Sequence, residues 1–379
     1  MNVIKNIKLL QNNSILYNKA VFFDSKIRQI TDEAEVSKLG TIDKIIDGKG
    51  MYLSPGFIDV HVHGCSSYDV MDQDPDNLKI ISSNLARTGV TSFLPTTMTL
   101  GLSEIENALI KIRKNKDLVD GAQILGCHLE GPFISKIYKG AHDENYIIPP
   151  DYELVEKYSD IIKIITLAPE LDGSMEFIDF CKERNIIVSI GHTNATYEKA
   201  TEAIHRGAKH FTHTYNAMTP LKHREPGAVG AAMLHDVTCE IIADNIHVHP
   251  AAQKVLVKTK GYQKVVLITD AMRACLMCDG SYNLGGQEVI VNDRQARLKD
   301  GTLAGSVLTL NTALKNIIHS TDTPLPYAIE MLTMTPAKLL NIYSQKGSID
   351  TDKDADFTIF DDNFNIHFTI AGGKIIYGS

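Results

Sequence analysis

The segment GFIDVHVHG, residues 56–64, is apolar enough for a buried β-strand, yet it carries two histidines one residue apart. Side chains alternate between the two faces of a strand, so His61 and His63 point the same way, with Cα atoms roughly 6.5–7 Å apart. Both imidazoles could therefore bind one ion. The alternative is a pair of ordinary polar residues at a strand end, and the rest of the sequence decides between the two.

Seven further apolar segments have the length and composition of buried strands, and segments of helical period separate most of them. Together with 56–64, the predicted strands are 91–98, 124–132, 161–170, 185–193, 210–218, 239–248 and 264–272. The predicted helices between them cover 76–88, 102–116, 174–184, 196–206 and 250–259. Eight strands alternating with helices predict an α/β fold, a (β/α)₈ barrel.

The two ends of the chain have a different pattern. Residues 1–50 and 347–379 alternate like short antiparallel strands joined by Asn and Asp turns. Neither piece is long enough to form a stable domain alone. We therefore expect both to pair in one small β-sandwich beside a barrel that covers 51–346. The remaining predicted elements are a hairpin at 286–304 and closing helices at 306–320 and 325–341.

Composition excludes several classes of protein. The net charge of −8 disfavours a general affinity for nucleic acid, which needs a basic face. No stretch approaches the about 20 apolar residues of a membrane span, and the N-terminus lacks a signal-peptide core. Six scattered cysteines give no disulfide framework. We therefore expect a cytoplasmic protein that binds neither nucleic acid nor membrane.

Six side chains of the types that bind metals fall at or near the C-terminal ends of predicted strands, where barrels collect their functional groups. They are His61 and His63 on the first strand, Glu130 on the third, His192 on the fifth, His213 on the sixth and Asp270 on the eighth. Burying so many ionisable groups unpaired would cost several kcal/mol each, which a divalent cation can offset. Imidazole and carboxylate ligands favour Zn²⁺, with Fe²⁺, Mn²⁺ or Co²⁺ also compatible.

These donors exceed the needs of one tetrahedral ion. The simplest assignment gives His192 and His213 to one metal and His61 and His63 to a second. Glu130 then bridges the two.

Asp270 is left for proton transfer. A metal-bound water has its pKa lowered to roughly 7, and a nearby carboxylate can accept its proton and pass it to a leaving group. The predicted reaction class is hydrolysis at a carbonyl.

With these residues in place, the sequence resembles the amidohydrolase superfamily and, more narrowly, its N-acetylglucosamine-6-phosphate deacetylases. The motifs that carry the resemblance are PGFIDVHVHG (55–64), HLEGPF (128–133), KGAHDEN (139–145), GHTNAT (191–196), HTYNAM (213–218), REPGAVGA (224–231), ADNIHVHP (243–250), LITDAM (267–272) and GTLAGS (301–306). Many amidohydrolases bridge their metals with a carboxylated lysine on strand four. Strand four here ends without one, and Glu130 takes that place in the deacetylases.

The resemblance implies a role for each matched residue. Glu130, His192 and His213 would hold the main metal, and Asp270 would be the general base and acid. His142 would point at the acetyl carbonyl. Whether a second ion occupies the His61 and His63 site stays open.

A sugar phosphate also needs an anion site. Arg224 can grip phosphate with two hydrogen bonds, His247 can add a donor, and the backbone N–H groups of Asn216 and Ala217 can help. The resemblance implies that Arg224 reaches a neighbouring subunit's site, and therefore a homodimer. From the sequence alone, Arg224 could equally form a surface ion pair with Glu225.

The reaction implied is metal-dependent hydrolysis of the N-acetyl group of N-acetylglucosamine 6-phosphate to glucosamine 6-phosphate and acetate. A deacetylase for N-acetylgalactosamine 6-phosphate is the nearest alternative, because one epimeric hydroxyl leaves little trace in a sequence. A dihydroorotase-like enzyme is disfavoured by the missing lysine. A non-catalytic scaffold is disfavoured because every ligand position is filled.

Overall fold

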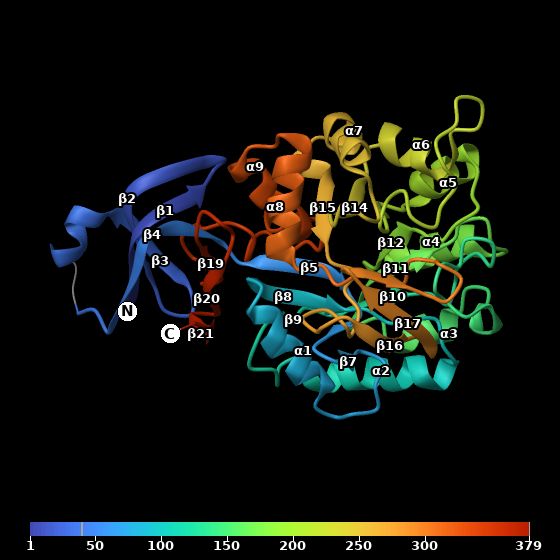
Figure 1. Ribbon diagram of the computed structural model, residues 1–379, viewed down its shortest axis with the longest axis horizontal. Helices are drawn as coiled ribbons and strands as arrows, with labels where there is room; N and C mark the ends of the chain where they lie inside the picture. The colour runs from blue at the N-terminus through green and yellow to red at the C-terminus, as the bar shows by residue number, and fades with distance from the viewer. Residues whose placement is uncertain (39–40, 379) are drawn as a thin grey trace.

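Eight parallel strands, each followed by a helix, form a barrel in the computed structural model, which describes residues 1–38 and 41–378 (Figure 1). The strands are β5 (Phe57–Val62), β8 (Val90–Pro95), β10 (Cys127–Glu130), β11 (Ile162–Leu167), β12 (Ile187–Ile190), β13 (His210–Phe211), β14 (Thr238–Ile242) and β15 (Val265–Ile268). The helices that follow them in turn are α1 (Asn77–Ala86), α2 (Leu102–Asn115), α3 (Tyr152–Lys157), α4 (Ser174–Glu183), α5 (Tyr197–Arg206), α6 (Gly227–Leu234), α7 (Pro250–Lys260) and α8 (Leu310–Thr321). The predicted (β/α)₈ barrel is confirmed.

The barrel wall consists of two hydrogen-bonded sheets, β5-β8-β9 and β10 through β15, where β9 is Gln123–Ile124. Parallel bridges from Thr96 to His128 and from Val62 to Ala271 join the sheets at both seams. Almost every strand residue is buried, as expected where helices cover a parallel sheet. The C-terminal ends of all eight strands therefore open on one mouth.

Both ends of the chain lie in a separate seven-stranded sheet, shown in blue and red in Figure 1. Its strands, in spatial order, are β21 (Lys374–Tyr377), β20 (Ile366–Ala371), β19 (Phe357–Phe360), β4 (Lys44–Pro55), β1 (Asn2–Gln11), β2 (Ser14–Phe23) and β3 (Ile27–Asp32). Two strands separate β2 from β19, so in a flat sheet they would lie about 14 Å apart. The rings of Phe23 and Phe357 are nevertheless 5.3 Å apart, so the sheet curls over its own core. The predicted terminal β-sandwich is confirmed, while its boundaries at residues 50 and 347 stay predictions.

Removing one ring of this core is expected to destabilise the terminal sheet strongly. Phe23→Ala deletes a side chain that is 1% exposed and packed on Phe357, a change that typically costs about 3–5 kcal/mol. Tyr17→Ala, on the same strand but 61% exposed, should change the free energy of unfolding by less than about 0.5 kcal/mol. Urea unfolding of both variants measures the difference, and equal effects would contradict the curled core.

The predicted sixth strand, 210–218, is wrong beyond Phe211. His213, Tyr215 and Ala217 have φ values of 28°, 82° and 48°, which an extended strand cannot contain. His213 therefore sits on a loop directly after β13. Non-glycine residues with φ values in the left-handed region carry backbone strain. Such residues cluster at functional sites.

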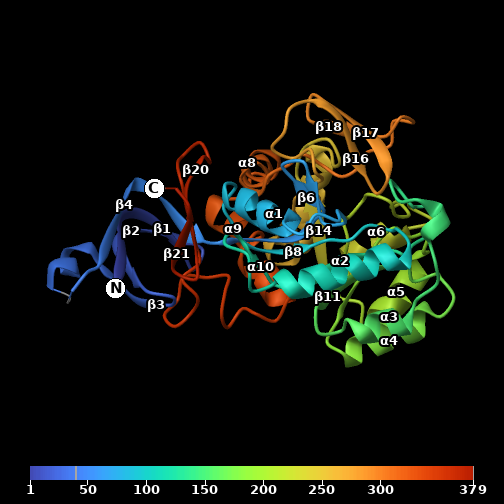
Figure 2. The same cartoon turned by 90° about the horizontal axis from the view of Figure 1, so that it is seen from below.

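The elements after the barrel differ in detail from the prediction. The predicted hairpin at 286–304 is a three-stranded sheet of β16 (Gly280–Leu284), β17 (Gln287–Asn292) and β18 (Gln295–Arg297), set beside the barrel (Figure 2). Strand β16 was not predicted because most of its residues are exposed, so its sequence has no apolar run. The single helix predicted at 325–341 is two helices, α9 (Leu325–Glu330) and α10 (Met334–Leu339). Pro336 explains the break, since it lacks an N–H and its ring clashes with the carbonyl four residues earlier.

The small elements complete the chain. They are β6 (Gly64–Cys65), β7 (Tyr68–Asp69) and 3₁₀ helices at Glu33–Lys38, Glu144–Tyr146 and Tyr262–Lys264. No helix within residues 1–38 and 41–378 is both long and apolar enough to cross a membrane.

Candidate metal centre and active site

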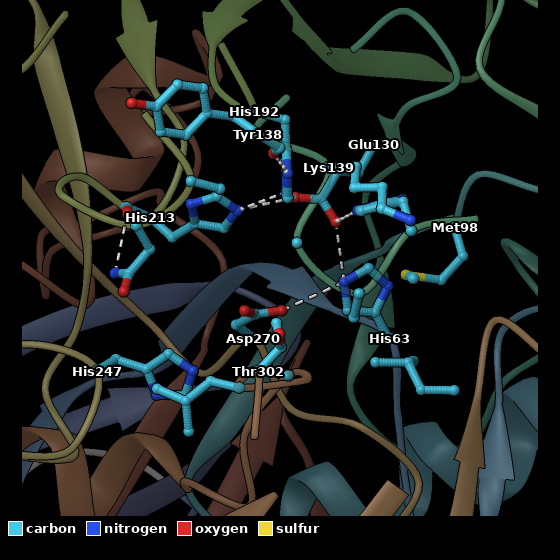
Figure 3. Close-up of a pocket in the computed structure, with 18 of the residues that line it drawn as sticks. His63, Met98, Glu130, Tyr138, Lys139, His192, His213, His247, Asp270 and Thr302 are labelled. Atoms are coloured by element: carbon cyan, nitrogen blue, oxygen red, sulfur yellow. Dashed lines mark hydrogen bonds and ion pairs between the residues drawn. The ribbon is translucent and has the colours of Figure 1, made fainter. Parts of the chain in front are cut away.

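Glu130, the last residue of β10, lies between two pairs of histidines at the barrel mouth. Figure 3 labels Glu130 together with His63, His192 and His213. Its Oε1 is 3.3 Å from Nε2 of His192 and 3.2 Å from Nε2 of His213. Its Oε2 is 3.3 Å from Nε2 of His61 and 3.1 Å from Nε2 of His63. The structure thus brings the five predicted ligands together, with one carboxylate oxygen facing each pair.

Hydrogen bonds on the far side of two rings fix which nitrogen faces the centre. Nδ1 of His63 lies 3.2 Å from the backbone oxygen of Thr96, and Nδ1 of His192 lies 2.8 Å from that of Tyr138. A carbonyl oxygen only accepts, so each Nδ1 carries the proton. In the neutral ring Nε2 then presents a lone pair to the centre, which is the tautomer that a metal ion requires.

The donor set fits a divalent cation. Nε2 of His192 and Nε2 of His213 are 3.0 Å apart, and Oε1 of Glu130 is buried without a hydrogen-bond donor among the described residues. In the tautomer that carries the proton on Nδ1 of His213, three electron-pair donors face one another at this spacing, and a cation between them would relieve their repulsion. Imidazole nitrogens and carboxylate oxygens are ligands that Zn²⁺ and its first-row neighbours accept.

Burial and the histidines act in opposite directions on the two carboxylates. Burial raises the pKa of Glu130, but the surrounding histidines, His61 first, hold that pKa well below its usual value. Burial likewise raises the pKa of Asp270, while His61 and His63 together lower it below the usual value. Both groups are therefore carboxylates at neutral pH.

Asp270 follows β15 and faces the His61 and His63 side of the centre. Its Oδ1 lies 3.4 Å from Nε2 of His61 and 3.2 Å from Nε2 of His63. Two hydrogen bonds fix its backbone: its N–H donates to the backbone oxygen of His61, and its carbonyl accepts from the N–H of Ser306. With 8% of its surface exposed, Asp270 can also meet a molecule in the cavity above.

His142 approaches the centre from the loop after β10. Its Nδ1 accepts a hydrogen bond from the N–H of Thr99 at 3.2 Å, so in the neutral ring Nε2 carries the proton. Nε2 lies 3.7 Å from Oε2 of Glu130. Burial, followed by the nearby His192, lowers the pKa of His142 to about 4, so the ring is a neutral donor at pH 7.

A cavity of about 450 Å³ opens above these groups. It lies within the size range of small-molecule sites, and His142, Asn216, Ala217 and His247 all line it. Nδ1 of His247 lies 2.7 Å from Oδ2 of Asp244, so its Nε2 is left for a ligand. The backbone N–H of Asn216 already donates to the oxygen of His213, so of the two predicted backbone donors only that of Ala217 is left for a ligand.

Arg224 lies outside this cavity. It is exposed on the loop before α6, and the residues lining the cavity do not include it. The alternative ion pair between Arg224 and Glu225 is also not formed. Glu225 pairs instead with Lys222, whose Nζ lies 3.4 Å from its Oε2. Arg224 is therefore free to meet another molecule.

Comparison with known proteins decides the family. The Amidohydrolase family profile matches residues 52–376. The chain belongs to the amidohydrolase family. Over 99% of its length it is 40% identical to the N-acetylglucosamine-6-phosphate deacetylase of Bacillus subtilis (strain 168), 97% of which is covered.

Solved structures agree with this result. The crystal structure of N-acetylglucosamine-6-phosphate deacetylase from Pasteurella multocida superposes on this amidohydrolase with a TM-score of 0.94, at 33% identity and 99% coverage of both chains. A mutant of the Mycobacterium smegmatis enzyme, solved in complex with N-acetyl-D-glucosamine-6-phosphate, gives a TM-score of 0.90 at 26% identity, again with 99% of both chains covered. The resemblance seen in the sequence motifs is confirmed.

Sequence reasoning missed several residues of this amidohydrolase. Lys139, Asp300 and Thr302 line the cavity, and only the fold brings the last two there, from the loop after β18. Glu240 and His210 lie in the barrel interior below the centre, each fully buried. A signal for Glu240 existed, because an acid inside the apolar run CEIIA is as unusual as the histidines of β5.

Proposed function

We propose that this amidohydrolase hydrolyses the N-acetyl group of N-acetylglucosamine 6-phosphate, releasing acetate and glucosamine 6-phosphate. The observation that carries the proposal is the placement of Glu130 between two histidine pairs, with Asp270 beside it, under a cavity of sugar-phosphate size. The names of the relatives support this substrate.

Glu130, His192 and His213 would hold one divalent cation, for which Zn²⁺ is our first choice, and His61 and His63 would hold a second through Oε2 of Glu130. A bound cation there would lower the pKa of water and polarise the amide carbonyl. The remaining chemistry falls to side chains of this chain.

Asp270 moves the proton. As a carboxylate, it accepts a proton from the attacking water at Oδ1 or Oδ2 and delivers it to the departing amine nitrogen. His142 directs its Nε2–H at the acetyl carbonyl oxygen, where negative charge develops. Both groups are buried, so bulk water does not weaken either interaction.

Phosphate recognition is shared between two copies of the chain in this proposal. His247 and the N–H of Ala217 contact the phosphate from within, and Arg224 of a second subunit closes the cavity of the first. The exposure of Arg224 and its lack of a carboxylate partner among the described residues support a homodimer.

Arg224→Ala is expected to raise KM for the phosphorylated sugar by about tenfold or more, because a charge-assisted hydrogen bond contributes about 1.5–3 kcal/mol. Steady-state kinetics measure the effect. Lys222→Ala, exposed on the same loop, should leave KM unchanged. An unchanged KM in Arg224→Ala would count against this anion site.

Acetate release tests the substrate. We expect the highest kcat/KM with N-acetylglucosamine 6-phosphate, a lower value with the galacto epimer, and a much lower value with unphosphorylated N-acetylglucosamine. Preference for the galacto epimer would assign the alternative reaction instead. No acetate from either phosphate would refute the proposal.

A cytoplasmic location is also part of the proposal. All six cysteines are free, and five of them are buried, which suits a reducing compartment.

A further inference from the structure

A buried carboxylate lies directly beneath the metal centre. Glu240, in the middle of β14, is fully buried, and its Oε2 lies 3.0 Å from Nδ1 of His61. The same oxygen accepts the backbone N–H of His213 at 3.0 Å. Glu240 therefore contacts both halves of the centre without reaching the cavity.

His210 holds the other oxygen of this carboxylate. Nε2 of His210 lies 3.0 Å from Oε1 of Glu240, and its Nδ1 lies 2.7 Å from the hydroxyl of Thr238. His210 is also fully buried. A hydrogen-bonded chain thus runs from Thr238, at the start of β14, through His210 and Glu240 to His61.

Only one of the four histidines has such a partner. The Nδ1–H groups of His63 and His192 donate to uncharged backbone carbonyls, and Nδ1 of His213 has no partner among the described residues. Glu240 in turn has no lysine or arginine partner within the part of the chain that the structure describes. Its buried negative charge is therefore available to stabilise a cation at His61.

Carboxylates in this position fix the ring of a metal-binding histidine and raise the affinity of the site. We infer that Glu240, oriented by His210, is the positioning residue that makes the His61 and His63 half-site bind a second cation. This inference rests on the proposed function and extends it, because it names the residue on which binding of the second cation depends.

Metal content separates the two half-sites. Wild-type protein, saturated with Zn²⁺ and dialysed, should hold two ions per chain. Glu240→Gln keeps the shape but removes the charge, so it should retain one ion, with the second bound about 10- to 100-fold more weakly. Glu330→Gln, a buried glutamate remote from the centre, is the matched control and should hold two ions. Elemental analysis and Zn²⁺ titration against a competing chelator give both quantities.

His210→Gln provides a second variant, which removes the partner of Glu240 on the side away from His61. It tests the role of Glu240 should Glu240→Gln fail to fold. It should weaken the same ion and leave the first. Two ions with wild-type affinity in a folded variant would overturn the inference. One ion in the wild type would overturn it too, while leaving the proposed hydrolysis intact. No bound metal in the wild type would refute both.

Discussion

Replacement of Glu130 by glutamine is expected to remove both metal ions and nearly all acetate release. Each oxygen of Glu130 faces a histidine pair at 3.1–3.3 Å, so a single substitution alters both half-sites. Glutamine has one acceptor oxygen, and its amide donor must face one of the two pairs. The fall in metal affinity should therefore exceed the about 10- to 100-fold typical of outer-shell substitutions.

Elemental analysis after dialysis measures the metal, and acetate release measures turnover. Glu330→Gln again serves as the control, since it also replaces a buried carboxyl but lies away from the centre. Near-wild-type metal content in Glu130→Gln would show that the carboxylate is not a shared ligand.

The Asp270→Asn variant should behave in the opposite way with respect to metal. Glu130, His192 and His213 remain, so the variant is expected to keep their ion. An asparagine cannot take up the proton of the attacking water, so kcat should fall by about 10²- to 10⁴-fold. The combination of retained metal and lost turnover identifies a proton carrier.

Asp236→Asn, at the opposite end of the barrel beside Lys264, is the matched control and should keep normal kcat. Single-turnover acetate release, measured on protein of known metal content, makes the comparison. A kcat within a few-fold of the wild type in Asp270→Asn would remove that residue from the mechanism.

The barrel could be predicted from the sequence because its strands are apolar runs that alternate with segments of helical period. His61, Glu130 and Asp270 were recognisable as site residues because they lie at or near the ends of these runs, and parallel strands end at one mouth. The positive φ of His213 leaves no such signal in the sequence, so the predicted sixth strand extends beyond its true end at Phe211. The exposed strand β16 lacks an apolar run altogether.

The residues in the barrel interior beneath the metal centre were harder to predict. Glu240 and His210 occupy strand interiors, and a period of two residues does not reveal which inward-facing side chains share a layer of the barrel. Their contact with His61 depends on the stagger between strands. Arg224 poses a different problem, because its proposed partner belongs to another copy of the chain.

Acetate release is expected to require a cation held by the histidine and carboxylate centre. The most direct test measures acetate from N-acetylglucosamine 6-phosphate, first with chelator-stripped protein and then after addition of Zn²⁺, Fe²⁺, Mn²⁺ or Co²⁺ in turn. We predict loss of activity on stripping and recovery with at least one ion, in proportion to the metal bound. Full activity in the stripped protein would contradict the account.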